Sequence, residues 1–178
     1  FNLCIMVSAI LFRPVSLGLS NARTYLFGAA FILGNLLLPQ LCHFIPEGGK
    51  MLLPIYFFTL IGAYKFGIRV GLLTAICSPL LNCLLFGMPP VAVLPVLLIK
   101  SSLLAIAAAA VAGYTHKLSL LHVAFVVLAY QLAGGVAEWG LAGNVQAAIQ
   151  DFTLGLPGIL VQIAGGWLVL KLLAKYEF

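Results

Sequence analysis

The stretch HFIPEGGKMLLPIY, residues 43–56, separates two long apolar runs and determines how the chain is divided. Its prolines, its glycine pair and the charged Glu47 and Lys50 are unsuited to the middle of a helix and typical of a loop. Between apolar runs of this length, the loop is expected at a membrane face. A second break, GMPP at residues 87–90, follows two apolar segments later, so it is expected on the same side of the bilayer.

The composition identifies an integral membrane protein. Of the 178 residues, 63% are hydrophobic and 7% are charged, whereas a soluble domain carries about 25% charged residues. A spanning helix needs about 20 apolar residues, so this length accommodates roughly six spans and no separate soluble domain. The alternation expected of strands is absent, which leaves helices as the way to satisfy backbone groups in lipid. We therefore predict a single domain over residues 1–178, an all-α integral membrane protein with a six-helix transmembrane bundle.

Six apolar segments are predicted to span the membrane. The connection between the last two contains a possible short amphipathic helix at residues 144–152. Residues 1–20 begin with an apolar run that is too short to span and that ends at Arg13, so they are expected to lie at the membrane interface. The predicted spans are Thr24–Cys42, Met51–Tyr64, Val70–Phe86, Val91–Tyr114, Leu120–Trp139 and Leu156–Leu173.

The basic residues predict the orientation, because Lys and Arg concentrate in cytoplasmic connections. When the sides alternate along the six spans, seven Lys and Arg residues fall on the side of both termini and one, Lys50, on the other, while Lys100 lies within a span. Both termini are therefore expected in the cytoplasm. The net charge of +5 is interpreted as this orientation signal and not as a nucleic-acid surface. The connections at residues 43–50, 87–90 and 140–155 are then expected to face outward.

Lys100 is the strongest candidate for a functional residue. It lies ten residues after Pro90, which places it roughly 15 Å deep at 1.5 Å per residue, near the middle of a ~30 Å hydrocarbon core. A charge at that depth is costly, so the side chain is expected to face the bundle or a wet cavity and to have a partner. One interpretation is a cation for the carboxylate or phosphate of a bound solute. The alternative is a structural pair with Glu138, or a side chain that reaches a head group.

Further polar and aromatic side chains are candidates for the same site. Glu138 is interpreted as an acceptor for polar groups of a solute, because Gln131 lies deeper on the same helical face. Asn82 and Gln162 are amides within spans, where a solute contact and an interhelical hydrogen bond are equally expected. For the aromatic candidates the alternative is the interfacial belt, and for the histidine it is a satisfied polar residue. The candidate substrate-binding residues are Lys100, Glu138, Asn82, Gln131, Gln162, Tyr56, His43 and Trp139.

No enzyme or metal site is predicted. The sequence contains no phosphate-binding loop, zinc-protease motif or serine-hydrolase motif, and its four acidic residues are well separated. The four cysteines include no C-x-x-C pair, so neither a disulfide nor a metal site is assigned. We therefore expect no catalytic residue and no cofactor. Active transport would need energy from a partner or from an ion gradient.

Several short motifs between Arg23 and Leu173 carry a family resemblance. They are LPQ at residues 38–40, HFIPEGG at 43–49, LPI at 53–55, SPL at 78–80, GMPP at 87–90 and GLPGIL at 155–160. In these motifs, which are mostly loops and packing glycines, the chain resembles the substrate-binding S components of energy-coupling factor (ECF) vitamin transporters.

The resemblance implies six helices around a pocket that opens outward, in the bacterial cytoplasmic membrane. It also implies partners: a transmembrane coupling (T) subunit and two cytoplasmic ATPases. The first helix of such a subunit docks on the coupling subunit through small residues, for which Ala30 and Gly34 are the best match. Gly34 departs from the family pattern of two alanines four residues apart.

The expected function is the capture of a water-soluble vitamin or related micronutrient. Lys100 suggests a solute that bears a carboxylate. The alternative, from a different class of protein, is a self-sufficient ion-coupled carrier or channel. That alternative would need paired ionisable groups along a path through the whole bilayer.

Overall fold

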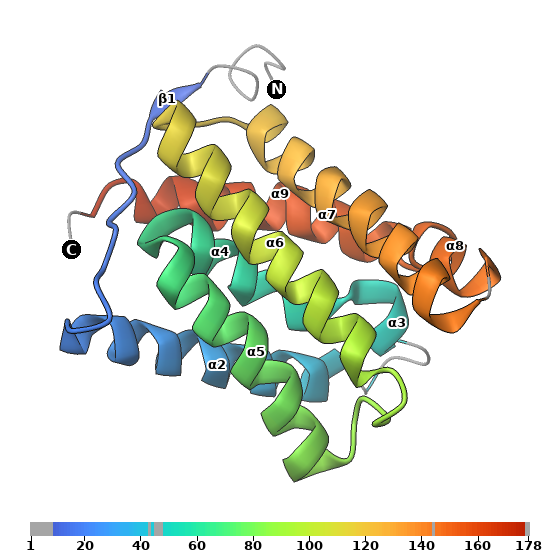
Figure 1. Ribbon diagram of the computed structural model, residues 1–178. Coiled ribbons are helices and arrows are strands. Elements are labelled where there is room, and N and C mark those ends of the chain that lie inside the picture. Colours follow the sequence, from blue (N-terminus) through green and yellow to red (C-terminus); the bar gives the residue numbers. More distant parts are fainter. Residues whose placement is uncertain (1–8, 43, 45–47, 144, 177–178) are drawn as a thin grey trace.

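The computed structural model describes residues 9–42, 44, 48–143 and 145–176, and most of these residues are helical. Within this part of the chain, five helices are long and apolar enough to cross a membrane. They pack side by side as a bundle (Figure 1). This confirms the predicted all-α, multi-pass membrane architecture. The five helices are α2 (Ala22–Cys42), α5 (Ile68–Phe86), α6 (Leu94–Thr115), α7 (Leu120–Ala142) and α9 (Leu156–Leu173).

The predicted span Met51–Tyr64 is not one continuous helix. It is divided into α3 (Gly48–Leu52), the 3₁₀ turn η1 (Pro54–Tyr56) and α4 (Phe57–Phe66). The break falls at Leu53, whose φ of 47° is left-handed. The residue before a proline is disfavoured in the α-helical region, and Pro54 has no N–H to continue the helix. The ten residues of α4 extend about 15 Å, half of a ~30 Å hydrocarbon core. The structure therefore has five candidate spans and one interrupted segment where six continuous spans were predicted.

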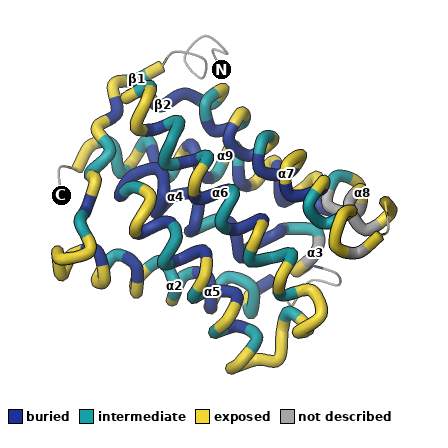
Figure 2. Tube along the Cα trace, in the orientation of Figure 1, coloured by how far each residue is buried: buried dark blue, intermediate teal, exposed yellow. Residues whose placement is uncertain are grey.

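Helix α4 lies at the centre of the bundle. It packs against α2, α5, α6 and α9, and every residue from Thr59 to Phe66 is buried. Figure 2 shows this helix in the buried colour, while the outer faces of the surrounding helices are exposed. A Cβ atom at Gly71 of α5 would lie only 2.5 Å from the Cβ of Ala63. Small residues thus allow α4 and α5 to approach closely, as is common between membrane helices.

Asn35 of α2 joins three helices through its amide. Its Nδ2 donates to Thr59 Oγ1 at 3.1 Å and to Ser78 Oγ at 3.2 Å. Its Oδ1 accepts from the Phe58 N–H at 3.2 Å. Phe58 lies in the first turn of α4, where N–H groups have no partner within the helix. Because α4 begins inside the bundle, away from water, Asn35 satisfies a backbone donor that would otherwise be buried without a partner.

The segment before α2 packs on one end of the bundle. Its strand β1 (Ile10–Leu11) pairs antiparallel with β2 (Lys117–Leu118), in the turn between α6 and α7. The buried Phe12 ring lies edge-on to Tyr64 of α4. Lys65 Nζ lies 5.1 Å from the centre of the Phe12 ring and donates to the Tyr176 carbonyl at 3.2 Å. This end of the bundle therefore holds both terminal segments (Figure 1).

Two short helices cover the opposite end. Helix α8 (Val145–Thr153) follows α7 and packs against α7 and α9, which confirms a short helix in this connection. Helix α3 packs on the N-terminal part of α9. Figure 1 shows α3 and α8 at the end of the bundle away from β1.

Gly158→Ala is expected to lower the free energy of unfolding by about 1–3 kcal/mol, the usual range for an overpacked site. A Cβ atom at Gly158 would lie 2.5 Å from the Leu52 carbonyl carbon and 2.7 Å from the Met51 carbonyl oxygen. Both are backbone atoms, so α3 must move away from α9. Denaturant titration in detergent micelles, followed by circular dichroism, measures the loss.

Gly113→Ala is the matched control for this prediction. Gly113 also lies in a helix, and a Cβ atom there would meet nothing within 4 Å. Alanine is the better helix former, so this variant should be stabilised by roughly 0.5–1 kcal/mol. If both glycine variants gain stability, α3 is not held tightly against α9.

Candidate functional site

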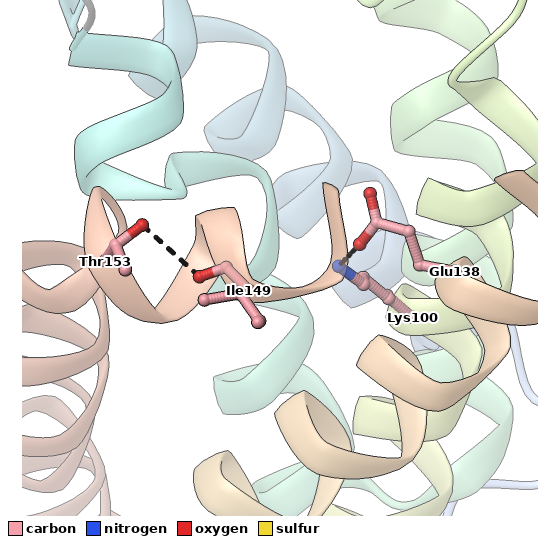
Figure 3. Close-up of polar contacts among 4 residues, drawn as sticks. All are labelled: Lys100, Glu138, Ile149 and Thr153. Carbon is pink, nitrogen blue, oxygen red and sulfur yellow. Dashed lines mark hydrogen bonds and ion pairs between the residues drawn. The ribbon is translucent and has the colours of Figure 1, made fainter. Parts of the chain in front are cut away.

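Lys100 and Glu138 form an ion pair across the α6–α7 contact. The Lys100 ammonium donates to Glu138 Oε2 (Figure 3), and the two side chains are 3% and 14% exposed. A Cβ atom at Gly134 would lie 2.6 Å from Lys100 Cγ. The absence of a side chain at position 134 therefore lets the lysine lie along α7 and reach the carboxylate. Of the two interpretations of Lys100, the structure shows the pairing with Glu138.

A second polar contact connects α7, α9 and the break before η1. The Tyr130 hydroxyl donates to Gln162 Oε1 at 2.8 Å, and Gln162 Nε2 donates to the Leu53 carbonyl at 3.4 Å. Both polar side chains are almost fully buried. The rings of Tyr56 and Tyr130 pack with their centres 5.4 Å apart. The interruption at Leu53 thus places a backbone carbonyl, which also accepts the Tyr56 N–H at 3.3 Å, beside Gln162 of α9.

Gln131 and Ser101 are buried polar residues without hydrogen-bond partners in the part of the chain that the structure describes. Gln131 is 1% exposed and Ser101 is fully buried. Among the described residues, neither polar atom of the Gln131 amide has a hydrogen-bond partner, and the Ser101 hydroxyl has none either. Gln131 lies along α7 between Tyr130 and Gly134, and Ser101 directly follows Lys100. The unpaired amide and hydroxyl are therefore adjacent in sequence to members of the two polar contacts described above.

The remaining predicted site residues lie elsewhere. Asn82 Nδ2 donates to the carbonyls of Asn35 and Ser78, each at 3.0 Å, so this amide joins α5 to α2. Trp139 is 53% exposed, as expected of an aromatic residue at a membrane interface. His43 lies outside the described residues.

The small residues predicted to dock on a coupling subunit face different surroundings. Ala30 is exposed on α2. At Gly34 a Cβ atom would lie 2.7 Å from the Phe58 ring. Gly34 therefore provides room for a side chain of α4 within this chain, while Ala30 remains on the outer surface.

The sequence does not predict a role for several residues of these contacts, among them Asn35, Ser101 and Tyr130. Asn35 is an amide within an apolar run, and the same pattern makes Asn82 a candidate residue. Ser101 and Tyr130 are each next to a candidate residue, but small or amphipathic side chains are common in membrane helices and carry little signal alone.

In the described part of the chain, the buried polar groups of α6, α7 and α9 are an ion pair, an amide with two unpaired atoms, a hydroxyl without a partner and a tyrosine–glutamine contact. Among the described residues, no group of three or more His, Cys, Asp or Glu side chains could hold a metal ion. The fold and the site together define a multi-pass α-helical membrane protein with buried polar groups on α6, α7 and α9. No family model, curated protein or solved structure matches the chain.

Proposed function

We propose that the chain is the membrane-embedded substrate-binding subunit of an ECF-type importer. It captures a water-soluble vitamin or related micronutrient outside the cell. Delivery inward depends on a transmembrane coupling subunit and two cytoplasmic ATPases. In this proposal the protein lies in the bacterial cytoplasmic membrane with both termini inside, so α3 and α8 lie on the outer side.

The unpaired Gln131 amide is the observation that supports a binding role most directly. A buried polar group without a partner costs about 1–3 kcal/mol, and such groups are rare in folded proteins. A bound solute that supplies the missing hydrogen bonds removes this cost. The motifs shared with ECF S components, from LPQ at residues 38–40 to GLPGIL at 155–160, add support from the sequence.

The arrangement of short helices also supports solute capture. Gln131, Lys100 and Glu138 lie on α6 and α7, and α8 follows α7 directly. Helix α8 packs against α7, which carries Glu138, and Figure 3 shows the Lys100–Glu138 pair and α8 in one view. In the proposed orientation, a solute entering from outside meets α3 and α8 before it reaches the polar residues.

The purified chain is expected to retain one small molecule and to hydrolyse no ATP by itself. The test incubates the protein in detergent with the small-molecule fraction of yeast extract, removes unbound material and identifies what remains by mass spectrometry. An unrelated membrane protein of similar size, treated in parallel, is the control. Retention of one enriched compound by this chain alone is the expected result, and no enrichment over the control contradicts the proposal.

Liposomes separate this function from that of a self-sufficient carrier. Liposomes that contain the chain alone should not accumulate the retained compound. Accumulation should require the coupling subunit, both ATPases and ATP. Uptake by the chain alone, driven by an ion gradient, would identify an ion-coupled carrier instead.

A further inference from the structure

We infer that the site recognises an uncharged solute through an adjacent hydrogen-bond donor and acceptor, such as the edge of an amide, a lactam or a pyrimidine-like ring. The inference rests on the proposed function and specifies the substrate class of the same site. It replaces the expectation, drawn from Lys100 alone, that the solute bears a carboxylate. Two observations carry it: the pairing of the buried charges, and the identity of the unpaired groups.

The two charges that the described residues bring together in the ion pair neutralise each other. Lys100 and Glu138 are both largely buried and in direct contact, so together they contribute no net charge. The Lys100 ammonium has three N–H donors, so an anionic solute could bind it beside the Glu138 carboxylate. Two negative charges would then share one positive charge in a region of low dielectric, where an uncompensated charge is costly. A neutral solute adds no such charge.

The unpaired Gln131 amide would be matched by one kind of chemical group on a solute. The Gln131 amide offers N–H donors on one side and a carbonyl acceptor on the other, and both atoms are buried without partners in the described chain. A cis amide or lactam edge presents the matching acceptor and donor in one plane. The Ser101 hydroxyl, which can donate or accept, is a third unpaired group. An ionised carboxylate has acceptors only, so it would leave the Gln131 carbonyl without a donor.

Selectivity follows from these unpaired groups. A site built to hydrogen-bond its substrate rejects an analogue that lacks the matching group by ~10⁴–10⁵-fold, because its own polar atoms are then left unpaired. We therefore expect the site to prefer the amide or lactam form of a compound to its carboxylate form.

Gln131→Leu provides the first test. Leucine removes the amide at similar volume, so retention of the yeast-extract compound should fall at least about 10-fold, as expected for one buried unsatisfied partner. The thermal stability of the unliganded variant should stay the same or rise, because the Gln131 amide makes no hydrogen bond to any described residue. If Gln131 had only a structural role, the substitution would lower both retention and unliganded stability. A fall in unliganded stability therefore overturns the solute-binding role of Gln131.

Ser101→Ala and Ser102→Ala are the matched pair for the hydroxyl. Ser101 is buried beside Lys100, whereas Ser102 lines an apolar groove on the outer face of α5 and α6, with Ile76 and Ile106 among its neighbours. Ser101→Ala should weaken retention several-fold, and Ser102→Ala should leave it unchanged. Equal effects in the two variants contradict a specific contact at Ser101.

The chemical class of the retained compound provides the decisive measurement. The compound released from the wild-type chain should be neutral at pH 7 by electrophoresis and should contain an amide, lactam or related edge by mass spectrometry. Retention of a carboxylate or phosphate compound overturns this inference but leaves the importer proposal intact. Retention of no compound overturns both.

Discussion

Asn35→Leu is expected to lower the free energy of unfolding by about 2–3 kcal/mol, more than the ~0.6 kcal/mol average of one interhelical hydrogen bond in a membrane protein. Leucine has the same number and branching of side-chain heavy atoms as asparagine, so the change removes the amide without leaving a cavity. It removes the hydrogen bonds to Thr59, Ser78 and the Phe58 N–H. The Phe58 donor then has no partner at the buried start of α4, which alone costs roughly 1–3 kcal/mol.

The measurement is reversible unfolding in mixed micelles, with increasing denaturing detergent and circular dichroism as the readout. Leu37→Ala on the same helix is the control, because Leu37 is 64% exposed. The control should change stability by less than about 0.5 kcal/mol. If Asn35→Leu behaves like the control, α4 does not depend on α2 for the hydrogen bonding of its first turn.

The interrupted segment shows how far the sequence predicts the fold. The long apolar runs predicted five of the helices to within a few residues, because helices of that length and composition have few alternatives. The run before Lys65 is short and apolar on all sides, so a membrane span and a buried central helix produce the same pattern. Pro54 was visible, but the left-handed conformation of Leu53 depends on packing that no local pattern encodes.

The candidate site was predictable in part for a related reason. An ionisable residue within an apolar run implies a partner, and on this ground the sequence alone indicates Glu138 as one of the alternative partners of Lys100. The role of Gly134, which makes room for the lysine stem, depends on the register of α6 against α7. For Gln131, too, the sequence predicts only part of the role. Its place on the polar face of α7 follows from helical spacing, but its lack of a partner among the described residues depends on every neighbouring side chain.

Lys100→Met is expected to lower the free energy of unfolding by about 2–4 kcal/mol, slightly below the ~3–5 kcal/mol typical when a fully buried pair loses one member. The reduction reflects the 14% exposure of the Glu138 side chain. Methionine keeps the unbranched stem that lies over Gly134, so the loss arises from the carboxylate that no longer contacts an ammonium. Denaturing-detergent titration at constant pH measures the change.

The double variant, Lys100→Met with Glu138→Gln, is the informative comparison. It removes both charges together, so it should recover most of the stability lost in Lys100→Met. Lys171→Met is the control for losing a cation elsewhere. Lys171 Nζ lies 4.7 Å from the centre of the Trp167 ring, and such a contact at a partly exposed site contributes only about 0.5–1 kcal/mol. If the losses at Lys100 and Glu138 simply add, the two charges are stabilised separately, and the neutrality argued for the binding site loses its basis.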